Sequence, residues 1–154
     1  MRRPLALAAL ALAVGLGAFL LLRGEPRSEA DQVRAAIEDI AEGARAADIA
    51  ATVAPVSRAY QDDDGLTRDG MKGFLFREFR SRGPIGVALG PIAVDIQGQQ
   101  ATASFEAALV EGVELTALDL NPDDGDVLHF DVSLQKEDDG AWRVVHHSRD
   151  RVFR

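Results

Sequence analysis

The chain has 154 residues, with 25 acidic and 17 basic side chains, a formal net charge of −8 and no cysteine. The lack of cysteine excludes disulfides, thiolate metal sites and thiol nucleophiles. All 25 acidic residues and 14 of the 17 basic residues follow Gly24. This part therefore carries a formal charge of −11, which argues against nucleic acid as a partner because phosphate binding needs a cationic surface.

The segment Leu5–Leu22 is a run of 18 residues without a charged or hydrogen-bonding side chain. As a helix it spans roughly 27 Å, close to the hydrocarbon core of a bilayer at about 30 Å. Arg2 and Arg3 precede it, as in a secretion signal or a signal anchor. Its bulky end, starting at Phe19, lacks the small residues of a cleavage site. We therefore expect residues 1–23 to be an uncleaved signal anchor, with a cleaved signal peptide as the alternative.

The same run predicts where the protein resides. Basic residues lie on both sides of it, Arg2 and Arg3 before and Arg23 and Arg27 after, so the positive-inside rule favours a cytoplasmic N-terminus only slightly. The short tail before the run resembles a signal-type insertion, which exports the C-terminal part. We expect a single-pass protein of the bacterial inner membrane with its C-terminal domain in the periplasm, and a secreted chain as the alternative.

Residues 24–27 are expected to form a linker, and residues 28–154 to form one domain. A chain of that length can bury about two-thirds of its unfolded surface without disulfides. Its first helix is predicted over residues 29–47, because apolar side chains recur there every three or four positions. Ser28 and Asp31 have the spacing of a capping box at the start of this helix.

A second, shorter helix and then a third helix are predicted next. Asp48 can cap a helix that ends near Val53, before Pro55. Thr67 can cap another helix after an acidic loop. Apolar residues form a stripe along one face of that third helix: Met71, Phe74, Leu75 and Phe79.

After Pro84 the hydrophobic period changes from helical to two, which is typical of antiparallel strands with one buried face. Five runs are predicted to be strands: residues 92–96, 101–109, 113–120, 128–134 and 142–153. Helices followed by strands indicate an α+β domain, with three helices on one side of an antiparallel sheet of about 4–6 strands.

The order of elements and three short motifs resemble the nuclear-transport-factor-2-like superfamily, which includes ketosteroid isomerases and many small bacterial domains. The motifs are Asp48–Val53, Tyr60–Asp62 and Asp139–Val145, and the resemblance covers about residues 29–150. It implies a cone-like fold, in which three helices pack against a strongly curved sheet. Some members use the open end of the cone for catalysis, many use it for binding, and in many it is filled core or a dimer surface.

Aromatic side chains are expected to converge inside this cone. On the last strand Trp142 and Val144 mark the interior face, and alternation places His146 on the same face. The candidate pocket residues are Tyr60, Phe74, Phe105, Phe130, Trp142 and His146. The alternative is that these side chains only fill the core.

His146 is the best candidate for proton transfer, because an unperturbed imidazole titrates near neutrality. Asp150 is on the same strand face but about 13 Å away, too far to orient the ring. A ketosteroid-isomerase mechanism is disfavoured, because the resemblance implies a tyrosine on the first helix and the only tyrosine is Tyr60. Asp95 and Asp131 fall on polar strand faces, so neither has the apolar surroundings of a buried acid.

No metal site and no cofactor are predicted. His146 and His147 are adjacent on a strand, so they point to opposite faces and cannot chelate one ion. The acidic loops at Asp62–Gly65 and Asn121–Asp126 lack the ligand spacing of a helix-loop-helix calcium site and are typical of turns. The chain has no phosphate-binding glycine loop and no G-x-S-x-G motif.

The sequence therefore favours a membrane-anchored, extracytoplasmic binding or assembly domain without a recognised catalytic set. Its expected partners are the membrane, through the N-terminal run, and a second copy of the chain, a membrane protein or an apolar small molecule. The alternative is a small isomerase, dehydratase or hydrolase that uses His146 and Tyr60.

Overall fold

The computed structural model describes residues 27–111 and 126–152. These residues form three helices followed by five strands, as expected for an α+β domain. In chain order the elements are α2 (Glu29–Arg45), α3 (Ile49–Val53), α4 (Arg68–Arg82), β1 (Ile85–Leu89), β2 (Ala93–Gln97), β3 (Gln100–Glu111), β4 (Asp126–Lys136) and β5 (Trp142–Arg151). The predicted strand over residues 113–120 and the predicted anchor lie outside the described residues.

Each helix begins where a capping side chain was predicted. The capping residues are Ser28, Asp48 and Thr67. The side-chain oxygen of each one accepts a hydrogen bond from the backbone N–H three residues later, at 3.1, 3.0 and 3.2 Å respectively. These bonds satisfy amide groups that the first helical turn leaves without a partner. The first helix ends at Arg45, two residues before the predicted boundary.

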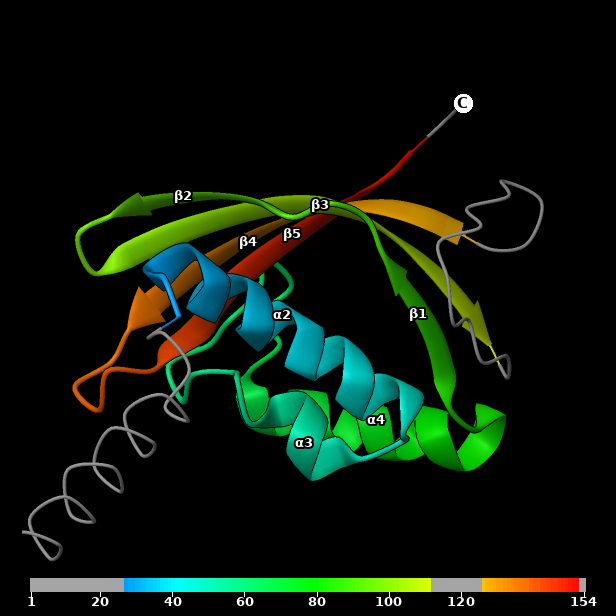
Figure 1. Ribbon diagram of the computed structural model, residues 1–154. Helices are drawn as coiled ribbons and strands as arrows, with labels where there is room; N and C mark the ends of the chain where they lie inside the picture. The colour runs from blue at the N-terminus through cyan, green and yellow to red at the C-terminus, as the bar shows by residue number, and fades with distance from the viewer. Residues whose placement is uncertain (1–26, 112–125, 153–154) are drawn as a thin grey trace, which may run out of the picture.

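The sheet is antiparallel and its strand order is β1-β3-β4-β5, with β2 also paired to β3. The long strand β3 has two partners on one edge: β2 pairs with Gln100–Ser104, and β1 with Ala107–Glu111. Figure 1 shows the sheet arching over α2, with α3 and α4 on the same concave side. The predicted curved sheet with three helices on one face is confirmed.

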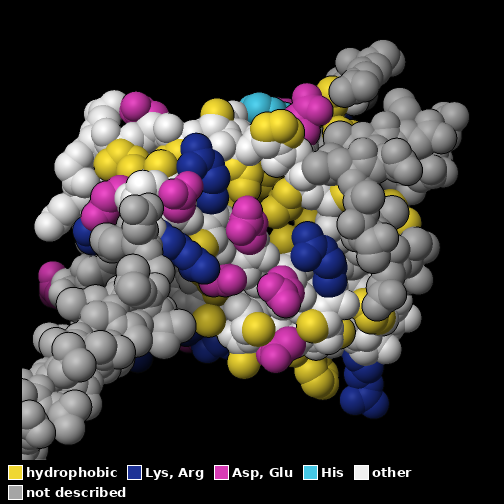
Figure 2. All heavy atoms as spheres, viewed as in Figure 1, with side chains coloured by type: hydrophobic (Ala, Val, Ile, Leu, Met, Phe, Trp, Pro, Cys, Tyr) yellow, Lys and Arg dark blue, Asp and Glu magenta, His cyan; other side chains and the backbone are white. Residues whose placement is uncertain are grey.

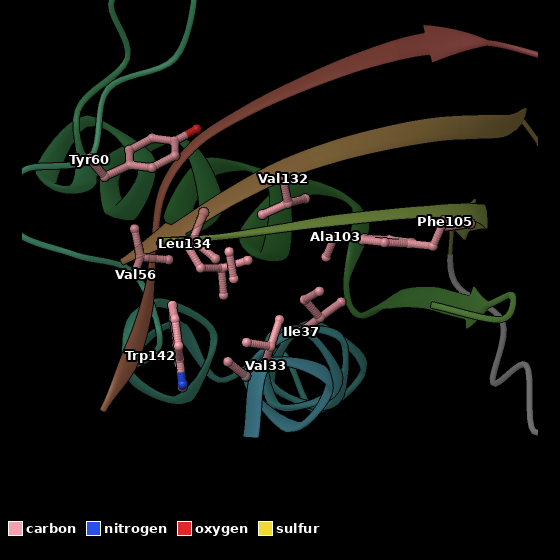
Figure 3. Packing of buried hydrophobic residues seen from close by; sticks show 13 residues of the cluster. Val33, Ile37, Val56, Tyr60, Ala103, Phe105, Val132, Leu134 and Trp142 are labelled. Carbon is pink, nitrogen blue, oxygen red and sulfur yellow. The ribbon is translucent and has the colours of Figure 1, made fainter. Parts of the chain in front are cut away.

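The core lies between α2 and the concave face of the sheet. Figure 3 shows Val33 and Ile37 of α2 pointing toward Ala103 of β3 and Leu134 of β4. The residues of the main core cluster all lie between Val33 and Val144, so the fragment 27–154 contains its own hydrophobic core. Figure 2 shows acidic and basic side chains interspersed on the helical side of the domain.

The segment Pro55–Gln61 runs along the free edge of β5. The backbone N–H of Ser57 donates to the carbonyl of Val144, and the N–H of Val144 donates to the carbonyl of Pro55, each at 2.9 Å. These bonds continue the sheet beyond its last strand, so Tyr60 is held beside β5.

Among residues 27–111 and 126–152, no helix is long and apolar enough to cross a bilayer. The candidate anchor Leu5–Leu22 is not among these residues, so its role stays a prediction.

Candidate functional site

A hydrogen bond between Tyr60 and His147 marks the candidate site. The phenolic oxygen lies 2.6 Å from Nδ1 of the imidazole. Tyr60 is only 2% exposed, and Figure 3 shows its hydroxyl pointing toward β5. The pair therefore joins the segment before α4 to the last strand at the edge of the core.

His147 occupies the interior face because β5 contains a β-bulge at Val145. Ser133 pairs with His146 and Leu134 with Val144, so Val145 is an extra residue on β5. An extra residue reverses the alternation of side chains beyond it. The expectation that His146 shares the interior face of Trp142 and Val144 is therefore wrong.

His146 instead points away from the core. Its Nε2 atom lies 2.9 Å from a carboxylate oxygen of Asp63, and both side chains are substantially exposed. The carbonyl of Val145 accepts a hydrogen bond from the backbone N–H of Gln61 at 3.2 Å. The bulge thus lets β5 bond to the segment Pro55–Gln61, and it turns the His147 side chain toward Tyr60.

Four rings form a row along the concave face. Phe105 and Phe130 stack with their centroids 5.5 Å apart, and Phe130 lies 6.2 Å from the ring of His147. The rings of His147 and Tyr60 are 6.0 Å apart and nearly parallel. Phe105 and Tyr60 are buried, whereas Phe130 and His147 are partly exposed, so the row is reachable at its middle.

Both members of the polar pair are held in their neutral forms. Burial raises the pKa of Tyr60 to about 12, with a further contribution from the nearby Asp62 carboxylate. Burial is also the main cause that lowers the pKa of His147, and the Arg149 guanidinium lowers it further. Near neutral pH the pair is therefore a phenol bonded to an uncharged imidazole.

The position of the imidazole proton follows from this bond. The hydroxyl of Tyr60 has no other hydrogen-bond partner among the described residues, and a buried hydroxyl proton needs an acceptor. Nδ1 of His147 meets that need when the ring proton is on Nε2. The pair therefore leaves an Nε2–H group that can donate to another molecule.

Arg149 adds a positive charge next to this donor. It pairs directly with Phe130 across the strands, and His147 pairs with Val132, so both residues share the interior side of β5. The guanidinium is exposed and has no ion-pair partner among residues 27–111 and 126–152. The site thus combines apolar rings, one neutral donor and one cation, with the Asp62 and Asp63 carboxylates also close enough to act on the pair.

The other candidate pocket residues have separate positions. Phe74 is 43% exposed on α4 and makes no ring contact with the row in the described part of the chain. Trp142 is buried, and its indole N–H donates to the Glu29 carboxylate at 2.6 Å. It lies six residues along the strand pair from Phe130, roughly 20 Å away, where it closes the core against the start of α2.

Comparisons with solved structures identify the fold. An NTF2-like protein with a cystatin-like fold from Novosphingobium aromaticivorans has 19% sequence identity and a TM-score of 0.63, with 90% of this chain and 89% of that chain covered. An NTF2-like protein of unknown function from Pseudomonas putida KT2440 has 16% identity and a TM-score of 0.64, covering 81% of this chain and 87% of its own. The chain has the NTF2-like fold.

A proposed dehydratase of the NTF2-like family from Streptomyces avermitilis has 13% identity and a TM-score of 0.64, over 82% of this chain and 97% of its own. No family model matches the chain, and no curated protein matches it. At these identities the likeness establishes the NTF2-like fold, and function has to be argued from the site.

The NTF2-like domain also brings Ser104 close to His129 on the convex face of the sheet. The serine hydroxyl lies 3.1 Å from Nε2 of His129, and an oxygen of Asp131 lies 3.6 Å from the same nitrogen. A catalytic triad needs the carboxylate on the other ring nitrogen, where it can orient the base. The three residues therefore do not form a triad.

No group of three His, Cys, Asp or Glu side chains among the described residues is placed to hold a metal ion. In the acidic loop Asp62 accepts hydrogen bonds from the backbone N–H groups of Asp64 and Leu66, at 3.0 and 2.7 Å. Its carboxylate shapes a turn, as the sequence predicted for this loop. The loop at Asn121–Asp126 lies mostly outside the described residues.

Proposed function

We propose that residues 27–152 form a binding domain that takes a small apolar molecule against the rings of Phe130 and Phe105, and that the run Leu5–Leu22 holds this domain at a membrane. The hydrogen bond between Tyr60 and His147 carries the proposal. It occupies the imidazole lone pair that a general base needs. The polar pair at the site is therefore suited to recognition.

The surroundings of His147 support binding over proton transfer. No carboxylate among the described residues is hydrogen-bonded to its ring, so the pair lacks the third group that usually orients a catalytic base. Tyr60, with its pKa raised to about 12, holds its proton under ordinary conditions. An isomerase, dehydratase or hydrolase built on Tyr60 and His146 also lacks contact between those residues, because His146 bonds to Asp63.

The apolar part of the site supports the choice of ligand. Leu128 and Phe130 face the concave side and are only partly buried. They adjoin the buried Phe105 and Ala107, their direct cross-strand partners on β3. A ligand ring or alkyl chain placed on these side chains removes apolar surface from water, at about 25 cal/mol per Å².

The test uses the fragment 27–154 and the neutral fluorescent probe N-phenyl-1-naphthylamine. We expect a saturable rise in fluorescence that Phe130→Ser weakens at least about tenfold, equivalent to about 1.4 kcal/mol. Phe76→Ser is the matched control, because Phe76 is 55% exposed on α4, away from the ring row. Probe binding that is absent, or equal in the two variants, contradicts the proposed site.

A further inference from the structure

We infer that the ligand of this site is an amphiphilic carboxylate, whose acid group binds Arg149 and the Nε2–H of His147 while its apolar body lies on Phe130 and Leu128. This inference rests on the proposed binding function and names the chemical class of the ligand. It goes beyond an apolar pocket because it assigns a polar end to the ligand and two protein groups to that end.

The strand register brings the two donors to one place. His147 and Arg149 are two residues apart on β5 and pair with Val132 and Phe130 on β4. Side chains two residues apart on a strand point to the same face, with a spacing of about 6.5–7 Å. A carboxylate between them can therefore accept one hydrogen bond from the imidazole and another from the longer guanidinium side chain.

Arg149 differs from its neighbours of the same type on β5. Arg143 forms ion pairs with Glu137 and Asp139, at 2.6 and 2.7 Å. Arg151 lies 3.7 Å from a carboxylate oxygen of Asp126. Arg149 has no such partner among the described residues, so its guanidinium is available for an anionic ligand.

His147 supplies a donor whose orientation is fixed. Its Nδ1 lies 2.6 Å from the buried Tyr60 hydroxyl, and this hydrogen bond holds the ring in position. With the phenol as the donor, the ring proton is on Nε2. The Nε2–H has no acceptor among residues 27–111 and 126–152, although the ring is partly exposed. A carboxylate oxygen gives this group its missing acceptor, and a charged acceptor forms a stronger bond than a neutral one.

The apolar side chains on the concave face of the sheet continue beyond Phe105 and Phe130 toward the end of β3 and the start of β4. Leu128 lies next to Phe130 on the same face of β4, and Ala107 and Leu109 continue that face beyond Phe105 on β3. The face is apolar on β3 and β4, and the two donors, the neutral imidazole of His147 and the cationic guanidinium of Arg149, lie on β5. A molecule with an apolar body and one acidic end matches this division, whereas an uncharged hydrocarbon leaves Arg149 and the imidazole donor unused.

The proposal is tested with 2-naphthoate and the isosteric neutral amide 2-naphthamide, by calorimetric titration into the fragment 27–154. We expect the acid to bind at least about tenfold more tightly than the amide. Arg149→Gln is expected to remove that difference by weakening only the acid, and His147→Gln to weaken the acid at least about threefold. Arg77→Gln, an exposed change on α4, is the control and should leave both affinities unchanged.

The outcomes separate the carboxylate inference from the proposed binding function. Equal affinities for acid and amide, together with binding of the neutral probe, overturn the carboxylate inference and leave the proposed binding function standing. An acid preference that persists in Arg149→Gln also overturns the inference. A protein that binds neither naphthyl compound nor the neutral probe contradicts the proposed function itself. Circular dichroism of each variant confirms that the fold is intact before titration.

Discussion

His147 links the protonation of one side chain to the stability of the domain. Burial lowers its pKa in the folded state, with Arg149 adding to the effect, so the folded protein favours the neutral ring. The unfolded chain binds a proton near the ordinary histidine pKa of about 6.5. The stabilising contribution is therefore complete above that pH and is lost as the pH falls through the lower folded-state pKa.

We expect the free energy of unfolding, measured by urea titration, to decrease between pH 7.5 and pH 5. His147→Gln should reduce the size of that decrease, because the substituted side chain does not titrate. The difference in unfolding free energy between the parent and His147→Gln at each pH cancels the contribution of the carboxylates, which both proteins share. Parallel pH profiles for the parent and the variant contradict the assignment.

The sequence placed the aromatic residues of the site more successfully than its histidine. Phe105 and Phe130 were predicted to face inward, and they do, because strand alternation reports burial directly. Tyr60, named only as a candidate pocket residue before the third helix, is 2% exposed. Alternation counted from Trp142 selected His146, and the bulge at Val145 reversed the faces. Nothing in residues 142–147 signals the bulge, because the carbonyl of the bulge residue Val145 accepts its hydrogen bond from the backbone N–H of Gln61, far away in the chain.

At the scale of elements, α2 and α3 meet at Gly43. By helix propensity alone, a glycine inside a helix destabilises it by about 1 kcal/mol relative to alanine. In the structure a Cβ at this position lies 2.5 Å from the backbone nitrogen of Thr52 and 2.8 Å from its Cα. The glycine therefore allows a close approach of the two helices, which its helix propensity does not reveal.

Gly43→Ala is expected to destabilise the domain by about 1–3 kcal/mol, because the backbone of α3 must move to admit the methyl group. The matched control is Gly73→Ala in α4, where the nearest atom to the new Cβ is the flexible end of Arg77 at 3.8 Å. That change should stabilise by about 0.5–1 kcal/mol. Urea unfolding measures both, and a stabilised Gly43→Ala variant excludes the close contact.

The elements themselves were predictable to different degrees. All three helix caps were identified, because a capping side chain acts on amides only three residues away. β1 was missed: its residues Ile85–Leu89 include no polar side chain to reveal an alternation, and both faces of its centre are buried. The stripe on α4 placed Leu75 inward correctly but also included Phe74, whose side chain is 43% exposed.

At the scale of the whole molecule, charge and apolar surface are separated along the chain. The formal charge after Gly24 is −11, and a protein surface of that sign is repelled by anionic lipid headgroups. The apolar run Leu5–Leu22 has the opposite tendency, since its 18 residues favour a hydrocarbon environment. The proposed attachment to a membrane therefore rests on that run alone.

The full chain is expected to stay in the membrane fraction after washes with high salt and with alkaline carbonate, because insertion of an apolar helix does not depend on ionic contacts. The intact mass of the mature chain should include residues 5–22, and a chain lacking them should appear in the wash. A mature mass that begins after residue 23 shows instead that the run is a cleaved signal. A membrane-bound chain that salt alone releases shows that ionic contacts hold it.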